Sequence, residues 1–160
     1  MWEQLSDRPD IEGLQCYVEA ALAERGEEIE FIVLFGSMAR GNWSRGSDFD
    51  LLIGLRIEDG KRFMDRIYDY ERVAPGPIEP FVYSQSEWAQ MWQGLHMTFL
   101  EAADYGIPLF DRGVWARIRK EFAAHLEAGV VERRPGGWQR YPERMASVSR
   151  DGTSSEPSAP

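Results

Sequence analysis

The chain has 160 residues, 43% of them hydrophobic, and this length favours one globular domain with a core that needs no disulfides. Its formal net charge of −9 lowers the expectation of a nucleic acid partner, because such binding depends on neutralising phosphates. The absence of a long apolar run and of a signal-peptide pattern, together with a single cysteine, Cys16, is typical of a cytoplasmic protein without a membrane span.

The first half of the chain alternates between helical and extended patterns. Apolar residues recur at helical spacing from Ile11 to Leu22, and Gly26 follows where such a helix would end. The apolar run 31–35 predicts a strand buried on both faces, and residues 48–55 predict a second strand with polar residues at its start. A second helix follows, and its expected apolar face consists of Phe63, Met64, Ile67 and Tyr68.

The second half begins after the break at Pro75-Gly76-Pro77. Residues 78–83 predict a third strand, and Ser84 with Glu87 forms the pattern of a helix capping box. The helix that starts there is expected to bend at Gly94. Its apolar face consists of Trp88, Met91, Trp92, Leu95 and Phe99.

The remaining elements complete the expected fold. A short strand is predicted at 107–110 and a last helix over 115–126, so strands alternate with helices along the chain. This alternation predicts an α/β or α+β domain, a small sheet with helices packed on it, over residues 1–131. Residues 132–160 form a C-terminal extension, which is rich in Ser, Pro and charge and is expected to be disordered from about residue 146.

The first chemical feature is Gly36-Ser37, which follows the first buried strand and precedes a segment that can open a helix. Glycine lets the backbone approach a ligand closely, and the unpaired N–H groups of a helix start suit phosphate. The hydroxyl of Ser37 offers one further hydrogen bond to a phosphate oxygen. Taken alone, the pair is more typical of a strand-to-helix turn capped by serine.

The second feature is the pair Asp48 and Asp50 at the start of the second strand. Residues two apart share one face of a strand, and oxygen ligands are those that magnesium prefers. Solvated acids at an exposed edge are the alternative, but the apolar residues that follow indicate a central strand. Ten residues separate Ser37 from Asp48, enough for a turn, a short helix and a return to the neighbouring strand. The spacing can therefore place both acids beside the glycine turn.

Gly36-Ser37, ten residues and Asp48-Phe49-Asp50 together resemble the G-S-x10-D-x-D motif of the DNA polymerase β-like nucleotidyltransferases. The fuller segments FGSMARG and SDFDLLIGL are similar to those of the minimal nucleotidyltransferases (MNT proteins), over roughly residues 30–110. The resemblance implies a polymerase β-like core that binds a nucleoside triphosphate at Gly36 and Ser37. It also implies magnesium, as two ions, on Asp48 and Asp50.

The family pattern includes a third carboxylate on a following strand, and Glu79 matches it. The resemblance therefore implies that Glu79 is catalytic and ligates metal. Two departures from the pattern matter: many members have Asp there, and Pro80 predicts an edge or irregular strand because proline cannot donate to a ladder. A surface acid after the preceding turn is the alternative.

Two further residues are nucleotide-binding candidates. The guanidinium of Arg40 can reach a phosphate, or it forms a structural ion pair, for example with one of the aspartates. Ser47 either caps or steers Asp48, or it is only a turn residue.

Members of this family transfer nucleotides to antibiotics, proteins or nucleic acid ends. Small MNT proteins are typically paired with a helical HEPN-type ribonuclease toxin, and the resemblance implies transfer of AMP from ATP to a tyrosine of that partner. The acidic balance and the short segment after the helix that follows the third strand favour this acceptor over nucleic acid. The alternatives are a nucleotide-binding antitoxin without turnover, a dimeric transferase acting on a small molecule, and a globular domain with a coincidental motif.

Overall fold

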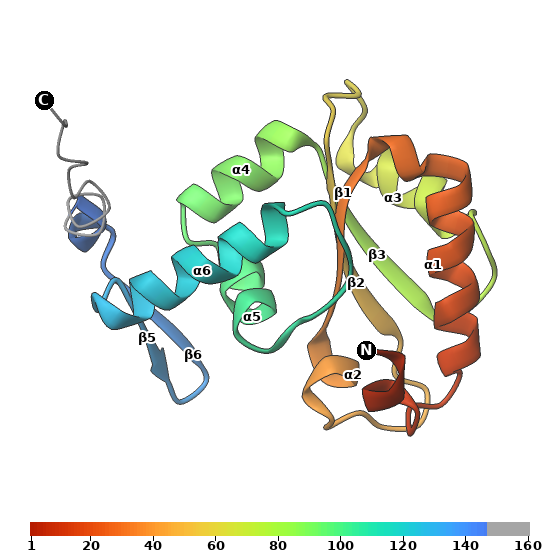
Figure 1. Ribbon diagram of the computed structural model, residues 1–160, viewed down its shortest axis with the longest axis horizontal. Coiled ribbons are helices and arrows are strands. Elements are labelled where there is room, and N and C mark those ends of the chain that lie inside the picture. Colours follow the sequence, from red (N-terminus) through yellow and green to blue (C-terminus); the bar gives the residue numbers. More distant parts are fainter. Residues whose placement is uncertain (147–160) are drawn as a thin grey trace, which may run out of the picture.

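The computed structural model describes residues 1–146, in which a four-stranded sheet lies between two layers of helices (Figure 1). The disorder expected from about residue 146 falls on residues outside this range. The sheet strands are β1 (Ile29–Phe35), β2 (Phe49–Leu55), β3 (Ile78–Tyr83) and β4 (Ile107–Asp111). The helices are α1 (Ile11–Arg25), α2 (Gly36–Arg40), α3 (Phe63–Glu71), α4 (Gln85–Gln93), α5 (Met97–Tyr105) and α6 (Val114–Glu127).

The sheet has the order β3-β2-β1-β4 and is mixed. β1 runs antiparallel to β2 and β4, whereas β2 and β3 are parallel and are joined through α3. All four strands expected from the sequence are present, and β3 lies at the edge of the sheet, as Pro80 predicts. A small mixed sheet with helices packed on it is therefore confirmed.

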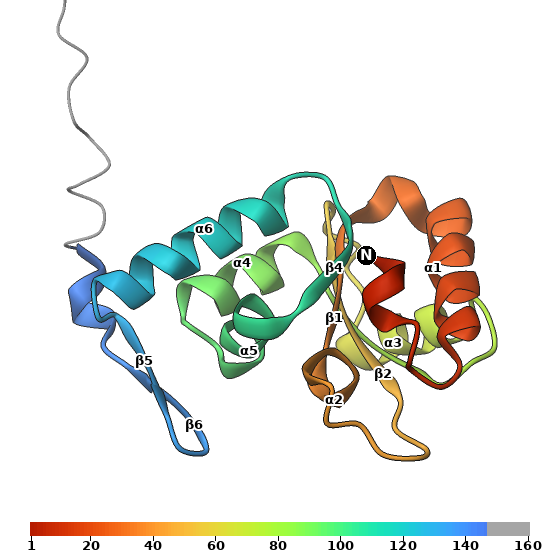
Figure 2. The same ribbon diagram turned by 60° about the horizontal axis from the view of Figure 1, so that its bottom comes forward.

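The two faces of the sheet carry separate hydrophobic cores, and β1 contributes to both because successive side chains alternate. Ile32 and Leu34 pack with residues of α1 and α3 in one core. Phe31 and Val33 pack in the other with residues of α4, α5 and α6. The views in Figures 1 and 2 both place α1 and α3 on one side of the sheet and α4 to α6 on the other. Burial on both faces confirms the prediction for this strand.

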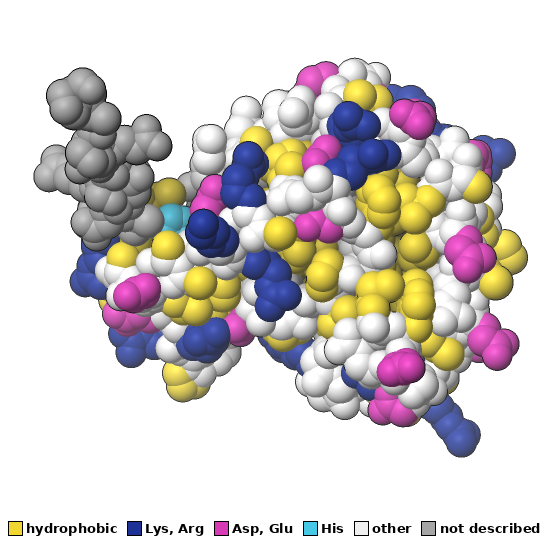
Figure 3. Space-filling model, in the orientation of Figure 1, with side chains coloured by type: hydrophobic (Ala, Val, Ile, Leu, Met, Phe, Trp, Pro, Cys, Tyr) yellow, Lys and Arg dark blue, Asp and Glu magenta, His cyan; other side chains and the backbone are white. Residues whose placement is uncertain are grey.

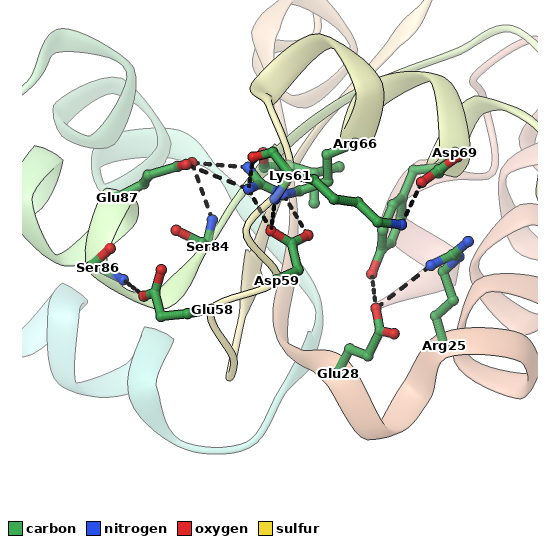
Figure 4. A network of polar contacts seen from close by, with 12 residues as sticks. Arg25, Glu28, Glu58, Asp59, Lys61, Arg66, Asp69, Ser84, Ser86 and Glu87 are labelled. Atoms are coloured by element: carbon green, nitrogen blue, oxygen red, sulfur yellow. Dashed lines mark hydrogen bonds and ion pairs between the residues drawn. The ribbon is translucent and has the colours of Figure 1, made fainter.

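The predicted apolar face of α3 is wrong for Met64 and Tyr68, whereas Phe63 and Ile67 are half-buried. Met64 and Tyr68 are 68% and 58% exposed, and the helix instead buries Tyr70 and Arg66. The Arg66 guanidinium binds both carboxylate oxygens of Asp59, at 2.8 and 2.9 Å (Figure 4). It also donates to Oε2 of Glu87 on α4 at 2.9 Å. Arg66 can be buried because acids from a loop and from another helix bind its guanidinium. The apolar periodicity of α3 carries no information about these distant acids.

We expect Arg66→Leu to lower the free energy of unfolding by roughly 3–5 kcal/mol, because Asp59 and Glu87 would lose their shared partner in a partly buried position. Urea denaturation followed by circular dichroism measures this change. Arg62→Leu is the matched control, because Arg62 is 89% exposed and its ion pair contributes at most about 1 kcal/mol. Equal losses in the two variants would contradict the assignment of Arg66 as a buried anchor.

The helix expected to run onward from Ser84 is two helices. The capping box of Ser84 and Glu87 is present at the start of α4, as predicted. The expected bend at Gly94 is a full break, since Leu95 is buried with φ of 54° and His96 caps the start of α5. α5 therefore starts in a new direction and reaches the end of the sheet where β1 finishes.

Two elements follow α6 that the sequence patterns did not indicate. β5 (Val131–Arg134) and β6 (Gly137–Arg140) form an antiparallel hairpin. Trp138 of this hairpin packs edge-on against Phe122 of α6, with ring centroids 5.6 Å apart. The hairpin thereby extends the helical layer that contains α5 (Figure 2).

The surface charges bear on which partners suit the chain. On the face drawn in Figure 3, Lys and Arg side chains are interspersed with Asp and Glu rather than gathered into one basic surface. None of the helices within residues 1–146 combines the length and apolarity that crossing a bilayer requires.

Candidate active site

Three strand termini lie side by side at one end of the sheet. Because β1 is antiparallel to β2 and β2 is parallel to β3, the end of β1 lies beside the starts of both other strands. The register places Phe35, Asp50 and Glu79 in one row across the three strands. Residues in register on neighbouring strands project to the same face, so the two carboxyl groups are neighbours on the side covered by α5.

Gly36 lets the Asp50 carboxyl lie directly against the turn after β1. A Cβ atom on Gly36 would be 2.2 Å from Oδ2 of Asp50, far inside van der Waals contact. The φ of Gly36 is +70°, a conformation that residues with a side chain rarely adopt. The turn and the acid, separated by thirteen residues in sequence, are thus in contact, as the motif spacing predicts.

The helix that follows the turn is short. α2 has five residues, and the half-buried Ser37 lies in its first turn, where backbone N–H groups have no partner within the helix. α2 ends at Arg40, and the N–H of the next residue, Gly41, donates to the carbonyl of Ser37 at 2.9 Å. So short a helix has little dipole, and any attraction for phosphate must come from these N–H groups and the serine hydroxyl.

The carboxyl group of Asp50 has a raised pKa. Burial raises its pKa to about 7, and the hydrogen bond to Glu79 and the charges of Glu79 and Asp48 act in the same direction. Near neutral pH the two touching carboxyl groups therefore retain a proton that two solvated acids would lose. A cation placed between them would remove the repulsion that raises this pKa.

The carboxyl donors suit magnesium, which prefers oxygen ligands. Asp48 lies one residue before β2 and is exposed, and its charge reaches Asp50. Within residues 1–146, no three His, Cys, Asp or Glu side chains already form a group able to hold a metal ion. The contact present is that of Asp50 with Glu79, and joint metal binding by Asp48, Asp50 and Glu79 stays a prediction.

Arg40 and Ser47 have defined surroundings. Nη2 of Arg40 lies 3.4 Å from Oε1 of Glu101, so this arginine pairs with an acid of α5 rather than with an aspartate of the motif. The hydroxyl of Ser47 accepts a hydrogen bond from the N–H of Ser44 at 3.0 Å. Ser47 therefore stabilises the turn that leads into β2, and a nucleotide contact for it stays a prediction.

Two residues of α5 at this site were not predicted from the sequence. Glu101 contacts Arg40, and the ring centroid of Tyr105 lies 4.2 Å from the Arg40 guanidinium. The backbone of Gly36 acts on the pKa of the Tyr105 hydroxyl in the lowering direction, so this hydroxyl lies near the turn. Neither residue belongs to the motif, and their only sequence signal is their spacing of four on one helix, which is common.

The comparisons with known proteins agree with this geometry. The family model described as a nucleotidyltransferase domain matches residues 16–88. Residues 16–88 are thus similar to a nucleotidyltransferase domain. The matched segment contains the glycine turn and all three carboxylates, and it ends within α4, before α5 begins. No functionally curated protein is significantly similar to the chain.

One solved structure shares the fold of the chain, and two others are less similar to it. A chain from a variant of the toxin–antitoxin pair MntA–HpeT has a TM-score of 0.50 and 12% identity, covering 87% of this chain and 98% of its own. A toxin–antitoxin structure with AMP-PNP covers the same shares at 12% identity and a TM-score of 0.47. A candidate nucleotidyltransferase from Sulfolobus solfataricus is 21% identical, covers 62% of this chain and 78% of its own, and has a TM-score of 0.46. The polymerase β-like nucleotidyltransferase fold is thus confirmed.

Proposed function

We propose that the chain is a magnesium-dependent nucleotidyltransferase that moves AMP from ATP to a hydroxyl of a partner protein, as an MNT-type antitoxin. The observation that carries the proposal is the Asp50–Glu79 carboxyl pair packed against Gly36 inside a nucleotidyltransferase domain. A binding module without turnover has no need of two touching acids, which cost stability at neutral pH.

The proposed roles follow from the order of the strands. The triphosphate lies on the turn at Gly36 and Ser37, with Asp50 beside it on β2 and Glu79 beyond on the edge strand β3. Asp48 and Asp50 would hold magnesium, and Glu79 would complete the site. Bound magnesium would neutralise charge on the attacking and leaving oxygens.

The proposed reaction is an in-line displacement. The acceptor hydroxyl oxygen forms a bond to the α-phosphorus, and the bond between that phosphorus and the oxygen bridging to the β-phosphate breaks. Pyrophosphate leaves, and the proton of the hydroxyl passes to the carboxylate of Glu79, which is exposed at the sheet edge. The domain supplies mainly positioning and electrostatic stabilisation to this step.

A partner protein is the proposed acceptor for two reasons. The resemblance to MNT proteins implies ATP and a small helical HEPN-type partner, and the solved chain with a TM-score of 0.50 comes from a toxin–antitoxin pair. The net charge of −9 disfavours nucleic acid. Pro80, which departs from the family pattern, leaves Glu79 in register with Asp50.

Labelled ATP tests the proposal. The purified chain would be incubated with magnesium and ATP labelled on the α-phosphate, in lysate of its source cells, beside an Asp48→Asn/Asp50→Asn double variant. We expect label on one protein band with the wild type alone. Label on a small molecule would identify the alternative small-molecule transferase. Magnesium-dependent nucleotide binding without any transfer would support the non-catalytic module instead.

The raised pKa of Asp50 gives the metal affinity a specific pH dependence. Metal requires the carboxylate, so protons compete with it below the pKa of about 7. We expect the magnesium affinity of the wild type to fall up to about tenfold for each pH unit below 7 and to level off above it. Isothermal titration at several pH values measures this. A flat profile between about pH 5 and 8 would mean that Asp50 does not ligate the metal.

A further inference from the structure

We propose that Glu101 and Tyr105 of α5 are positioning residues that hold Arg40 ready for the polyphosphate of the bound nucleotide. The proposal rests on the function proposed above, and it adds residues outside the segment that matches the nucleotidyltransferase family. Arg40 is the last residue of α2, three positions beyond Ser37, and its side chain is 45% exposed. An arginine that exposed would otherwise sample many rotamers, and ordering it on binding would cost affinity.

Arg40 is held from two directions. Its guanidinium stacks over the ring of Tyr105, with 4.2 Å between the guanidinium carbon and the ring centroid. Its Nη2 lies 3.4 Å from Oε1 of Glu101. A guanidinium has five N–H donors, so the contact with Glu101 engages only part of its capacity for a phosphate.

Tyr105 and Glu101 are themselves fixed to each other and to the turn. The Tyr105 hydroxyl lies 3.3 Å from Oε2 of Glu101, so one carboxylate oxygen faces Tyr105 and the other faces Arg40. The backbone of Gly36 lies near enough to this hydroxyl to act on its pKa, in the lowering direction. Burial raises the pKa of Tyr105 to about 12, and the charge of Glu101 acts in the same direction, so the hydroxyl stays neutral at physiological pH. The contacts form a closed chain from the turn through α5 to Arg40.

The surroundings leave Arg40 accessible to a ligand. α2, at the lower end of the sheet in Figures 1 and 2, packs against α5, which lies on the face of the sheet covered by α4 and α6. Arg40 and Glu101 also line a cavity of about 320 Å³ between α5 and the β5–β6 hairpin. The guanidinium thus lies between the phosphate turn and an open volume, where an anion can approach it.

A purely structural role for these contacts makes different predictions. A partly exposed ion pair contributes at most about 1 kcal/mol to stability, so its loss should scarcely affect folding. A structural contact would change only the free energy of unfolding and would leave the nucleotide affinity unchanged. A positioning contact acts on nucleotide affinity, and only through Arg40.

A double-mutant cycle separates the two roles. The probe is the α,β-methylene analogue of ATP with magnesium, which cannot undergo transfer, and its Kd is measured by isothermal titration. We expect Arg40→Ala to weaken binding by about 10–100-fold, the loss typical of a charge-assisted hydrogen bond. Glu101→Gln and Tyr105→Leu should each weaken binding about 3–10-fold, and neither should weaken it further in the Arg40→Ala background. Tyr105→Phe keeps the stacked ring, so it should weaken binding of the analogue less than Tyr105→Leu does.

The control is Asp104→Asn on the same helix, because Asp104 pairs with Arg133 rather than with Arg40. Its Kd should stay within about twofold of the wild type. The positioning role would be overturned if the losses of nucleotide affinity in Arg40→Ala and Glu101→Gln were additive, or if Glu101→Gln left the Kd unchanged. Either result would leave the proposed function unaffected. A wild-type chain that fails to bind the analogue would overturn the proposed function and this inference with it.

Discussion

Asp50→Asn should reduce nucleotidyl transfer by at least about 10³-fold, a loss of roughly 4 kcal/mol of transition-state stabilisation. Asp50 is central to the site, because its carboxyl lies against Gly36 and is in hydrogen-bonding contact with Glu79. An amide has nearly the same shape but carries no charge for a metal ion. Single-turnover rates with saturating ATP and magnesium measure the loss without a contribution from product release.

The same variant should be more stable than the wild type at alkaline pH. The pKa of Asp50 is raised in the folded chain, so the neutral acid is favoured by folding and ionisation destabilises the fold. The stability of the wild type should therefore fall relative to Asp50→Asn as pH rises from about 4 to about 7, and the gap should then stay constant. Its upper limit is about 4 kcal/mol, at about 1.4 kcal/mol for each pKa unit.

Asp65→Asn is the matched control for both measurements. Asp65 lies on α3, is more than half exposed and pairs with Arg62. Its transfer rate should stay within about twofold of the wild type, and its stability should follow the wild-type pH profile. An Asp50→Asn protein that transfers nucleotide normally would mean that the carboxyl pair is not catalytic.

Gly36→Ala is the second substitution with a large expected effect, a loss of transfer of about 10²–10³-fold. The added methyl group would lie 2.2 Å from Oδ2 of Asp50, so either the turn or the carboxyl must move. Displacement by about 1 Å is enough for a loss of this size, because the reaction depends on positioning. Steady-state kinetics and nucleotide titrations on the same preparation would show loss of both binding and turnover.

Gly60→Ala separates this displacement from backbone strain. The φ of Gly60 is +66°, close to the +70° of Gly36, but a Cβ at Gly60 meets no atom within 4 Å. Backbone strain should lower the free energy of unfolding by roughly 1 kcal/mol in both variants, and the clash with Asp50 should lower it further in Gly36→Ala. Only Gly36→Ala should lose transfer, so matched activity losses in the two variants would show that strain alone is responsible.

The sequence predicted the core of this site because its residues are close together in the chain. A short connection that contains α2 joins β1 to β2, and the two strands are antiparallel neighbours. The turn at Gly36 after β1 therefore lies beside Asp50 at the start of β2. Glu79 was predicted from the family pattern, and its position beside Asp50 follows from the parallel pairing of β2 and β3. The spacing between the glycine turn and the polar start of the buried strand was more specific than either feature alone.

Other features depend on contacts between distant segments, which a single sequence does not encode locally. Arg66 is buried because Asp59 and Glu87 converge on it, so the apolar pattern of α3 indicated the wrong face. Leu95 adopts a left-handed conformation that is uncommon for leucine, so two helices stand where one was expected. Glu101 is at the site because α5 returns to the end of β1, about sixty residues beyond Arg40 in the chain.

The most direct test of the central claim compares two labels in one assay. The wild-type chain, magnesium and the acceptor-containing lysate would receive ATP labelled either on the α-phosphate or on the γ-phosphate, with Asp50→Asn beside it. Nucleotidyl transfer breaks the bond between the α-phosphorus and pyrophosphate. We therefore expect the α-label on the acceptor, the γ-label only in released pyrophosphate, and neither product with the variant. Transfer of the γ-label to the acceptor, or equal labelling by wild type and variant, would contradict nucleotidyl transfer at the Asp50–Glu79 site.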